Sequence, residues 1–347
     1  MLPDSLRHVI FDHDFNTTLV KGALPNGVTH ITFGDDFNID IRHCVLPDTV
    51  TSIEFGRIWN FPIDVCSFSG GRLTHLILKT FNHPLPPNAL PSTLLYLDLG
   101  AKFNHPVDNF RLPDSLQSLF LRDNFSQHIM SSLPSSLTSL TIGSFYLLPT
   151  VPLPSNLTHL TMTDKFNDPL QPSDIPLTIT TLTFGKAFNK KIHMTIKTKP
   201  TKGHSFLPKA FHSPSTQSVV SCIPSSVTSL TFGPKYNQPI PPGAIPPSVT
   251  SITFGTQFEQ KLGDRCIPKT VQHIGFGSQV NGNQYISIPE SVTQISFQQG
   301  LVSSKYFLNL CNVSRYQLKL MERMYTLLRV RQNPSIYLAL NTISLTD

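Results

Sequence analysis

Histidine, the side chain that most often binds a metal in proteins, recurs at one position of a repeated pattern in this sequence. His8, His30, His75, His159 and His273 each stand two residues after a recurring apolar residue. A metal site needs three or four donors at fixed spacing. Only two of these histidines, His8 and His30, belong to consecutive occurrences, and no Cys or carboxylate is spaced to complete a ligand shell. The sequence therefore predicts no metal site and no cofactor.

Catalytic groups are equally sparse. Glu54 and Asp98 hold comparable positions but stand alone, about two pattern lengths apart. The enzyme class that competes with a non-catalytic protein is a right-handed β-helix hydrolase, whose coils are similar in length. Such an enzyme needs clustered Asp or Glu on one sheet. The sequence also lacks a phosphate-binding Gly loop, a G-x-S-x-G elbow and an H-E-x-x-H motif, so we expect no enzymatic activity.

These residues occupy fixed positions in a repeat of about 22 residues, which occurs about thirteen times. The unit reads [LI]-P-x-x-L-x-x-L-x-F-G-x-x-F-N, as in LPNGVTHITFGDDFN from Leu24. L-x-x-L-x-L is the strand signature of leucine-rich repeats. Its last two apolar positions are two residues apart, so both side chains face the same side of a short strand. Stacked units then form a curved parallel sheet, and the 30 prolines disfavour helices on the convex side.

Two further rows complete each coil. An aromatic residue stands nine positions after the first apolar residue of most units, as at Phe37, Trp59 and Tyr236, and Asn usually follows it. We expect the aromatic residues to fill the return side of the coil as a stacked spine. The Asn carboxamide is expected to satisfy backbone groups of its own turn and of the next unit.

The chain resembles the FNIP-repeat proteins, which are similar to leucine-rich-repeat proteins and occur in social amoebae and in giant viruses that infect amoebae. The family is named for an element that appears here as FNHPL (Phe81 to Leu85), FNDPL (Phe166 to Leu170) and YNQPI (Tyr236 to Ile240). The resemblance covers residues 1 to about 300 with one interruption. It implies a repeat fold and an interaction role, and it brings no catalytic residues.

Departures from the repeat suggest four segments: repeats over 1–189, a basic insertion loop over 190–222, repeats over 223–302, and a C-terminal helical cap or tail over 303–347. No Asp or Glu occurs between Ile175 and Phe258. The insertion offers a weak site for an anionic partner at Lys190, Lys191, Lys197, Lys199 and Lys202. The cap is predicted from RYQLKLMERMYTLLRVRQNP, which is rich in helix formers and ends before Pro334. Met1 lies inside a repeat, so either the first coil frays or the sequence begins inside a longer array.

The main binding site is predicted on the open face of the sheet, the side opposite the apolar rows. Most residues there are Ser, Thr or Gly, but three adjacent units carry aromatic, aliphatic and charged residues instead. These residues are Ile77, Lys79, Tyr96, Asp98, Phe120 and Arg122. Exposed aromatic residues beside charges on a rigid surface are typical of an interface hot spot; drift at unconstrained surface positions is the other explanation of the same pattern.

We therefore expect a protein-interaction scaffold or adaptor with a protein partner. The alternative is a protein that binds nucleic acid or another anionic partner through the lysines and the C-terminal helix. Cys44, Cys66, Cys222, Cys266 and Cys311 are scattered without a C-x-x-C pair, as expected of free thiols. The sequence contains neither a secretory signal nor an apolar run of about 20 residues, and we expect a cytoplasmic protein without membrane contact.

Overall fold

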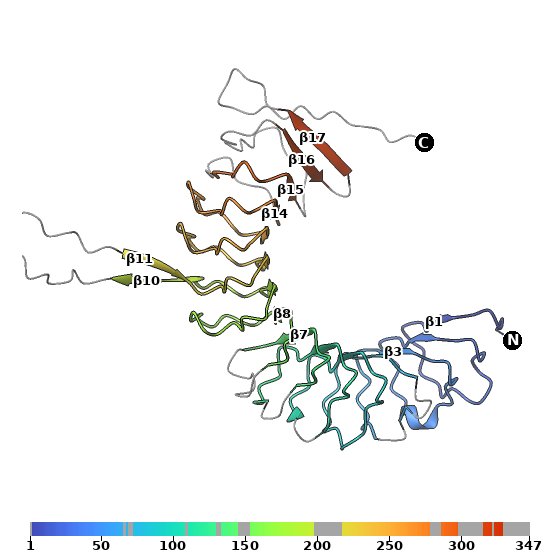
Figure 1. Ribbon diagram of the computed structural model, residues 1–347. Coiled ribbons are helices and arrows are strands. Elements are labelled where there is room, and N and C mark those ends of the chain that lie inside the picture. Colours follow the sequence, from blue (N-terminus) through green and yellow to red (C-terminus); the bar gives the residue numbers. More distant parts are fainter. Residues whose placement is uncertain are drawn as a thin grey trace, which may run out of the picture. The chain divides into compact units, whose positions relative to one another are not determined.

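The computed structural model describes residues 2–64, 67–68, 72–107, 110–129, 133–144, 153–197, 217–277, 286–297, 315–320 and 323–328. The chain divides into two compact units, Met1–Phe166 and Asn167–Asp347. Each unit contains solenoid coils, and each coil of the repeat carries one short strand that lies parallel to the strands of its neighbours (Figure 1). The predicted leucine-rich-repeat-like solenoid is confirmed. Within the described residues, the one helical element is a short 3-10 turn, Ile41–His43.

The first unit holds eight strands in chain order. They are β1 (His8–Ile10), β2 (His30–Thr32), β3 (Ser52–Phe55), β4 (His75–Leu78), β5 (Tyr96–Asp98), β6 (Ser118–Phe120), β7 (Ser139–Ile142) and β8 (His159–Met162). Each strand pairs in parallel with the next, and equivalent repeat positions face each other, as in Val9 with Ile31. The register places every apolar row in line along the stack.

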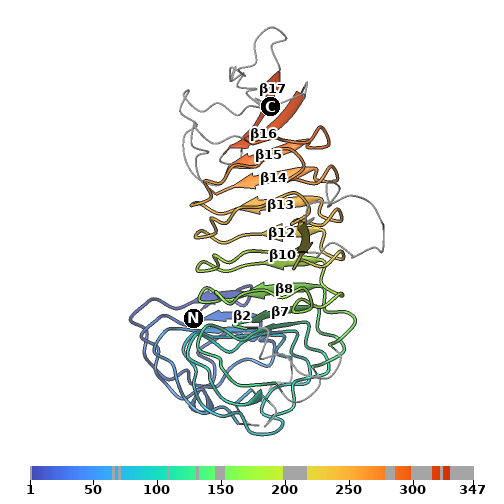
Figure 2. The same cartoon turned by 90° about the vertical axis from the view of Figure 1, so that its left-hand side faces the viewer.

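The second unit continues the pattern with β9 (Thr181–Thr183), β12 (Ser229–Thr231), β13 (Ser251–Phe254), β14 (His273–Phe276) and β15 (Gln294–Phe297). These five strands are also parallel neighbours, and Figure 2 shows β12 to β15 stacked in order. β12 pairs directly with β9, with Leu230 opposite Leu182, although 48 residues separate the two leucines in the chain.

The insertion forms a two-stranded antiparallel ribbon at its base. β10 (His193–Lys197) pairs with β11 (Gln217–Ser221), and the ribbon extends away from the coils of its unit (Figure 1). The sequence predicted only a loop here. Alternating residues such as Met194 and Ile196 give the segment a period of two, which favours a strand.

The predicted C-terminal helical cap was wrong for the residues that the structure describes. They form β16 (Arg315–Leu320), which pairs in parallel with β15, and β17 (Arg323–Leu328), which pairs antiparallel with β16. Tyr316, Leu318 and Leu320 alternate with polar residues, which is a strand pattern. The edge of β15 offers unpaired backbone groups, and strand pairing satisfies them where a helix does not. The rest of 303–347 lies outside the described residues.

Each coil begins with a turn that the Leu-Pro pair sets. The proline carbonyl accepts a hydrogen bond from the backbone N–H three residues later, for example Val28 to Pro25 at 3.2 Å and Val227 to Pro224 at 3.1 Å. Glycine usually follows the strand because coils approach closely there. A side chain at Gly56 would place its Cβ 1.9 Å from the Gly34 carbonyl oxygen of the preceding coil.

The core consists of stacked rings. Phe33 lies 5.4 Å from Phe55 of the next coil and 3.9 Å from Phe37 of its own coil, measured between ring centroids. The second unit repeats this arrangement with Phe184, Phe232 and Tyr236. The predicted aromatic spine is therefore confirmed in both units, and each of the rings named here is buried.

The Asn row joins one coil to the next, as predicted. The Oδ1 atom of Asn60 accepts the backbone N–H of Asn82 at 2.8 Å, and Asn82 accepts that of Asn104 at 3.2 Å. Asn167 accepts from Asn189 at 2.8 Å in the same way in the second unit. Each carboxamide thus pairs a backbone donor that the return segment leaves without a ladder partner.

Candidate functional site

The six residues of the predicted hot spot lie on three adjacent strands of the first unit or just after them. The register of β4, β5 and β6 aligns Ile77 with Asp98 and Asp98 with Phe120. We call this group, Ile77, Lys79, Tyr96, Asp98, Phe120 and Arg122, the open-face patch. The apolar rows of the same strands point into the core, so the remaining side chains are presented on the opposite side.

Aromatic rings form a continuous strip across the patch. The Tyr96 ring lies 5.7 Å from His75 on β4 and 4.8 Å from Phe120 on β6. Both Tyr96 and Phe120 are partly exposed. Partial burial, reinforced by the Asp98 carboxylate, raises the pKa of Tyr96, so its hydroxyl stays protonated at neutral pH. The strip offers a partner a flat apolar surface that ends in a hydrogen-bonding group.

Asp98 occupies a different environment from the exposed one that the sequence predicted. Its side chain is only 3% exposed. It accepts hydrogen bonds from Arg122 Nε, which lies 2.9 and 3.0 Å from the two carboxylate oxygens, and from the Gly100 N–H at 2.9 Å. Arg122 Nη2 also donates to Asp98. These hydrogen bonds raise the pKa of Arg122. The prediction failed because the long Arg122 side chain from the next coil covers the carboxylate. The repeat spacing predicts on which face of the sheet a side chain lies, but it does not predict how deeply that side chain is buried.

The same arrangement occurs two coils earlier in weaker form. Glu54 on β3 pairs with Lys79 at 2.9 Å, and Lys79 also lies 4.0 Å from Asp35. Lys79 and Arg122 both stand where other coils have glycine, and each reaches back to the acid of the preceding strand. The charges of the patch are therefore compensated inside the protein. Glu54 and Asp98 are each held in an ion pair, and Ile77 on β4 lies between them in the register of the sheet.

Arg122 contributes an additional contact to the aromatic strip. Its guanidinium carbon lies 5.9 Å from the centroid of the Phe120 ring. This distance is within the range of cation–π attraction. The contact fixes the edge of the strip and leaves about half of the Arg122 side chain exposed to a partner.

The histidine row places two rings in contact at the start of the first unit. His8 and His30 stack with centroids 4.1 Å apart. Partial burial, with the neighbouring His8 and His75, lowers the pKa of His30. Thr29 Oγ1 donates to the Arg7 carbonyl at 3.1 Å and lies 2.9 Å from His30 Nδ1.

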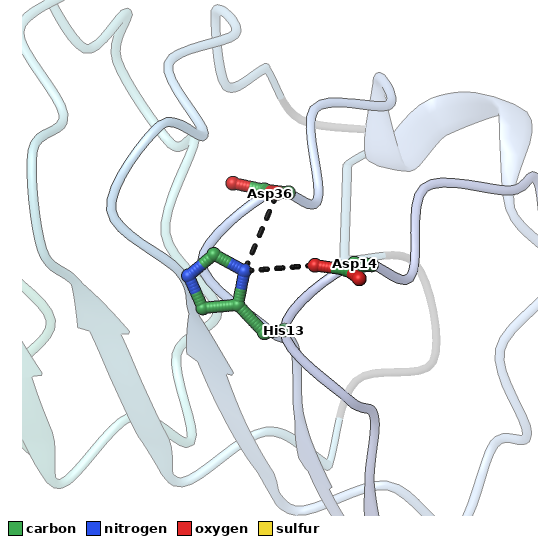
Figure 3. Close-up of side chains that lie close together, drawn as sticks. All are labelled: His13, Asp14 and Asp36. Carbon is green, nitrogen blue, oxygen red and sulfur yellow. Dashed lines mark hydrogen bonds and ion pairs between the residues drawn. The ribbon is translucent and has the colours of Figure 1, made fainter.

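A second titratable cluster lies at the turn after β1 and β2 (Figure 3). His13 Nδ1 is 3.1 Å from Asp14 Oδ1 and 3.3 Å from Asp36 Oδ2, with side chains that are 62%, 92% and 49% exposed respectively. The hydrogen bond with Asp14, followed by the charge of Asp36, raises the pKa of His13. The repeat pattern did not predict this cluster, although Asp14 and Asp36 hold equivalent positions 22 residues apart. Its exposure makes it a solvated ion-pair group.

The predicted anionic-partner site is described only in part. Lys190 is half-buried and Lys191 is exposed, and both precede β10. Lys197 is the last residue of β10. Lys199 and Lys202 lie outside the described residues. The structure therefore places two of the five lysines at the base of the ribbon.

Comparison with known proteins agrees with this architecture. The sequence model of the FNIP Repeat family matches residues 15–57, 59–102, 103–145, 148–187, 166–194, 219–257 and 236–279. The crystal structure of CroV588, described as a novel circular LRR protein, is similar with a TM-score of 0.53 and 29% sequence identity over 93% of this chain. This chain spans 49% of that protein's chain. No curated protein matches the sequence.

No helix within the described residues is both long enough and apolar enough to cross a membrane.

Proposed function

We propose that this chain, which belongs to the FNIP repeat family, is a non-catalytic scaffold or adaptor that binds a protein partner through the open-face patch. The observation that carries the proposal is the strip of His75, Tyr96 and Phe120 rings on three consecutive strands. Partly exposed, rigid aromatic side chains are the usual anchors of protein interfaces.

The surroundings of the strip support a protein partner over a small or strongly charged ligand. Neighbouring positions on β7 carry Ser139 and Thr141, which leave a flat surface beside the rings. Lys79 and Arg122 are already paired with acidic residues of the chain. Recognition therefore depends on apolar contact, and we expect affinity to change little with added salt.

The test compares partner capture by the intact chain with capture by the double variant Tyr96→Ala, Phe120→Ala. Proteins retained on the immobilised chain are quantified by mass spectrometry, and the affinity of each recovered partner is then measured directly. Loss of two aromatic anchors should weaken binding about 30-fold or more.

A matched control is Ser139→Ala with Thr141→Ala, which alters the open face of β7 without touching the rings. This control should bind like the unmodified chain. Equal affinities for both double variants, each with an unchanged circular dichroism spectrum, would rule out the open-face patch as the interface.

An anionic partner is the competing function that the sequence suggested. Part of its basis is lost, because residues 315–328 contain strands where a basic helix was expected. Salt separates the two functions: affinity dominated by phosphate contacts falls steeply with added salt, whereas affinity for the aromatic strip does not.

A further inference from the structure

The β10–β11 ribbon is an addition to a coil that closes without it. Ile192 and Cys222, which flank the ribbon, are fully buried, and the Cys222 N–H donates to the Ile192 carbonyl at 2.8 Å. Cys222 Sγ also lies 3.4 Å from the Leu170 carbonyl oxygen of the preceding coil. The coil thus joins directly across the base of the insertion, and β12 pairs with β9 as any other neighbour. The ribbon is not required by the solenoid architecture.

One face of the ribbon exposes large apolar side chains. Met194 is 40% exposed and Ile196 is 48% exposed. Both project from the same face of β10, because side chains alternate along a strand. Opposite them on β11 are Val220 and Ser218. The result is a narrow apolar strip on an element that projects from its unit.

β10 also has an edge available for pairing. In the described part of the chain, the sheet that contains β10 has only two strands, so β10 is paired on one side. A strand with a free edge accepts an extended peptide by main-chain hydrogen bonds, and the exposed side chains select which peptide fits. The edge of β10 and the strip of Met194 and Ile196 are adjacent features of one strand.

Charge indicates which peptide fits. The inserted residues 190–222 contain six lysines and no Asp, Glu or Arg. Lys190 and Lys191 stand at the base of the ribbon beside β10. Pairing of two such ribbons from two copies would bring like charges together, which is unfavourable. A segment rich in Asp and Glu gains attraction at the same place.

We propose that the β10–β11 ribbon is a docking arm for an acidic protein segment, which adds to the free edge of β10 as a further strand and covers Met194 and Ile196. This surface is separate from the open-face patch and belongs to the other unit. Lys190 and Lys191 supply long-range attraction, and the apolar strip supplies the contact that fixes register.

The test uses the full chain and a fluorescein-labelled peptide of roughly ten residues in which Glu alternates with Val. Fluorescence anisotropy should show saturable binding, and the same peptide with Lys in place of Glu should not bind. Met194→Thr with Ile196→Thr, which keeps β-branched strand formers, should weaken binding about tenfold. Lys190→Gln with Lys191→Gln should weaken it about fivefold and flatten its salt dependence.

Two control variants make the loss specific. Val219→Thr makes the same apolar-to-polar change on the opposite face of the ribbon and should leave affinity unchanged. Tyr96→Ala with Phe120→Ala should also leave it unchanged, which keeps this proposal independent of the proposed function. Hydrogen exchange should show new protection of the β10 amides when the acidic peptide is added.

Three results would overturn the proposal. The first is tighter binding of a single-stranded oligonucleotide of matched charge than of the acidic peptide. The second is self-association of the chain, detected by sedimentation and abolished by Met194→Thr with Ile196→Thr. The third is absence of peptide binding, or binding that the ribbon variants do not alter while circular dichroism confirms that they fold.

Discussion

Tyr236 introduces a hydroxyl group into a stack that otherwise consists of phenylalanine rings in the second unit. Its ring lies 5.8 Å from Phe188 and 6.1 Å from Phe258, and the side chain is fully buried. The hydroxyl has no hydrogen-bond partner among the described residues, and burial raises its pKa. Tyr236→Phe removes an unsatisfied polar group and keeps the ring, so it should raise the free energy of unfolding by about 1–2 kcal/mol.

Urea denaturation of the two proteins measures this difference. Tyr96→Phe is the control, because the Tyr96 hydroxyl is on a partly exposed side chain and its removal should change stability by less than about 0.5 kcal/mol. A loss of stability in Tyr236→Phe would show that the hydroxyl is satisfied in the folded protein, as by a buried water.

At the scale of single residues, the sequence predicted the hydrogen-bonding role of a side chain better than its burial. The role of the Asn row followed from residue type and period, because an amide at a fixed place in each turn meets the same backbone donor every time. The burial of Asp98 did not follow, because it depends on the reach of the Arg122 side chain from the next coil. The contact of His13 with Asp36 was missed for a related reason: it joins different positions of two successive units.

At the scale of the strand, the pair formed by Asp98 and Arg122 ties β5 to the coil of β6. Arg122→Ala removes the guanidinium donors of the buried Asp98 carboxylate and keeps the hydrogen bond from the Gly100 N–H. Uncompensated buried charge is costly, and we expect a loss of about 2–3 kcal/mol in the free energy of unfolding, reduced from the fully buried case because Arg122 is half-exposed.

Two further variants identify the cause by denaturant titration. Arg122→Lys keeps the charge but loses the bidentate hydrogen bonding, so its free energy of unfolding should lie between those of the unmodified protein and Arg122→Ala. Lys79→Ala removes the equivalent partner of the more exposed Glu54 and should cost less than about 1 kcal/mol. Equal losses for Arg122→Ala and Lys79→Ala would contradict the role given to burial.

Strands inside the repeat were predictable because each one is specified by the same three apolar rows and by identical neighbours. The elements outside the repeat were not. Residues 315–328 combine helix-forming residue types with an alternation of period two that favours a strand. Pairing with the edge of β15 selects the strand. The ribbon depends on pairing between segments about 20 residues apart in the chain, which local pattern does not specify.

At the scale of the molecule, each coil contacts mainly its two neighbours, so stability is a sum of local interfaces. Phe232 stacks on Phe184 and Phe254, each at 5.8 Å, and is almost fully buried. Phe232→Ala opens a cavity at two interfaces and should cost about 3–5 kcal/mol locally. Amides of β9, β12 and β13 should then exchange much faster, while those of β1 to β3 keep their protection.

The matched variant in the first unit is Phe33→Ala, because Phe33 stacks on Phe11 and Phe55 at 5.4 Å on either side. It should give the opposite pattern, with faster exchange in β1 to β3 and unchanged exchange in β12 and β13. Hydrogen exchange followed by mass spectrometry resolves both sets of strands in one experiment. If either substitution accelerated exchange equally in both units, the protein would unfold as one cooperative body, and nearest-neighbour stacking would not be what limits its stability.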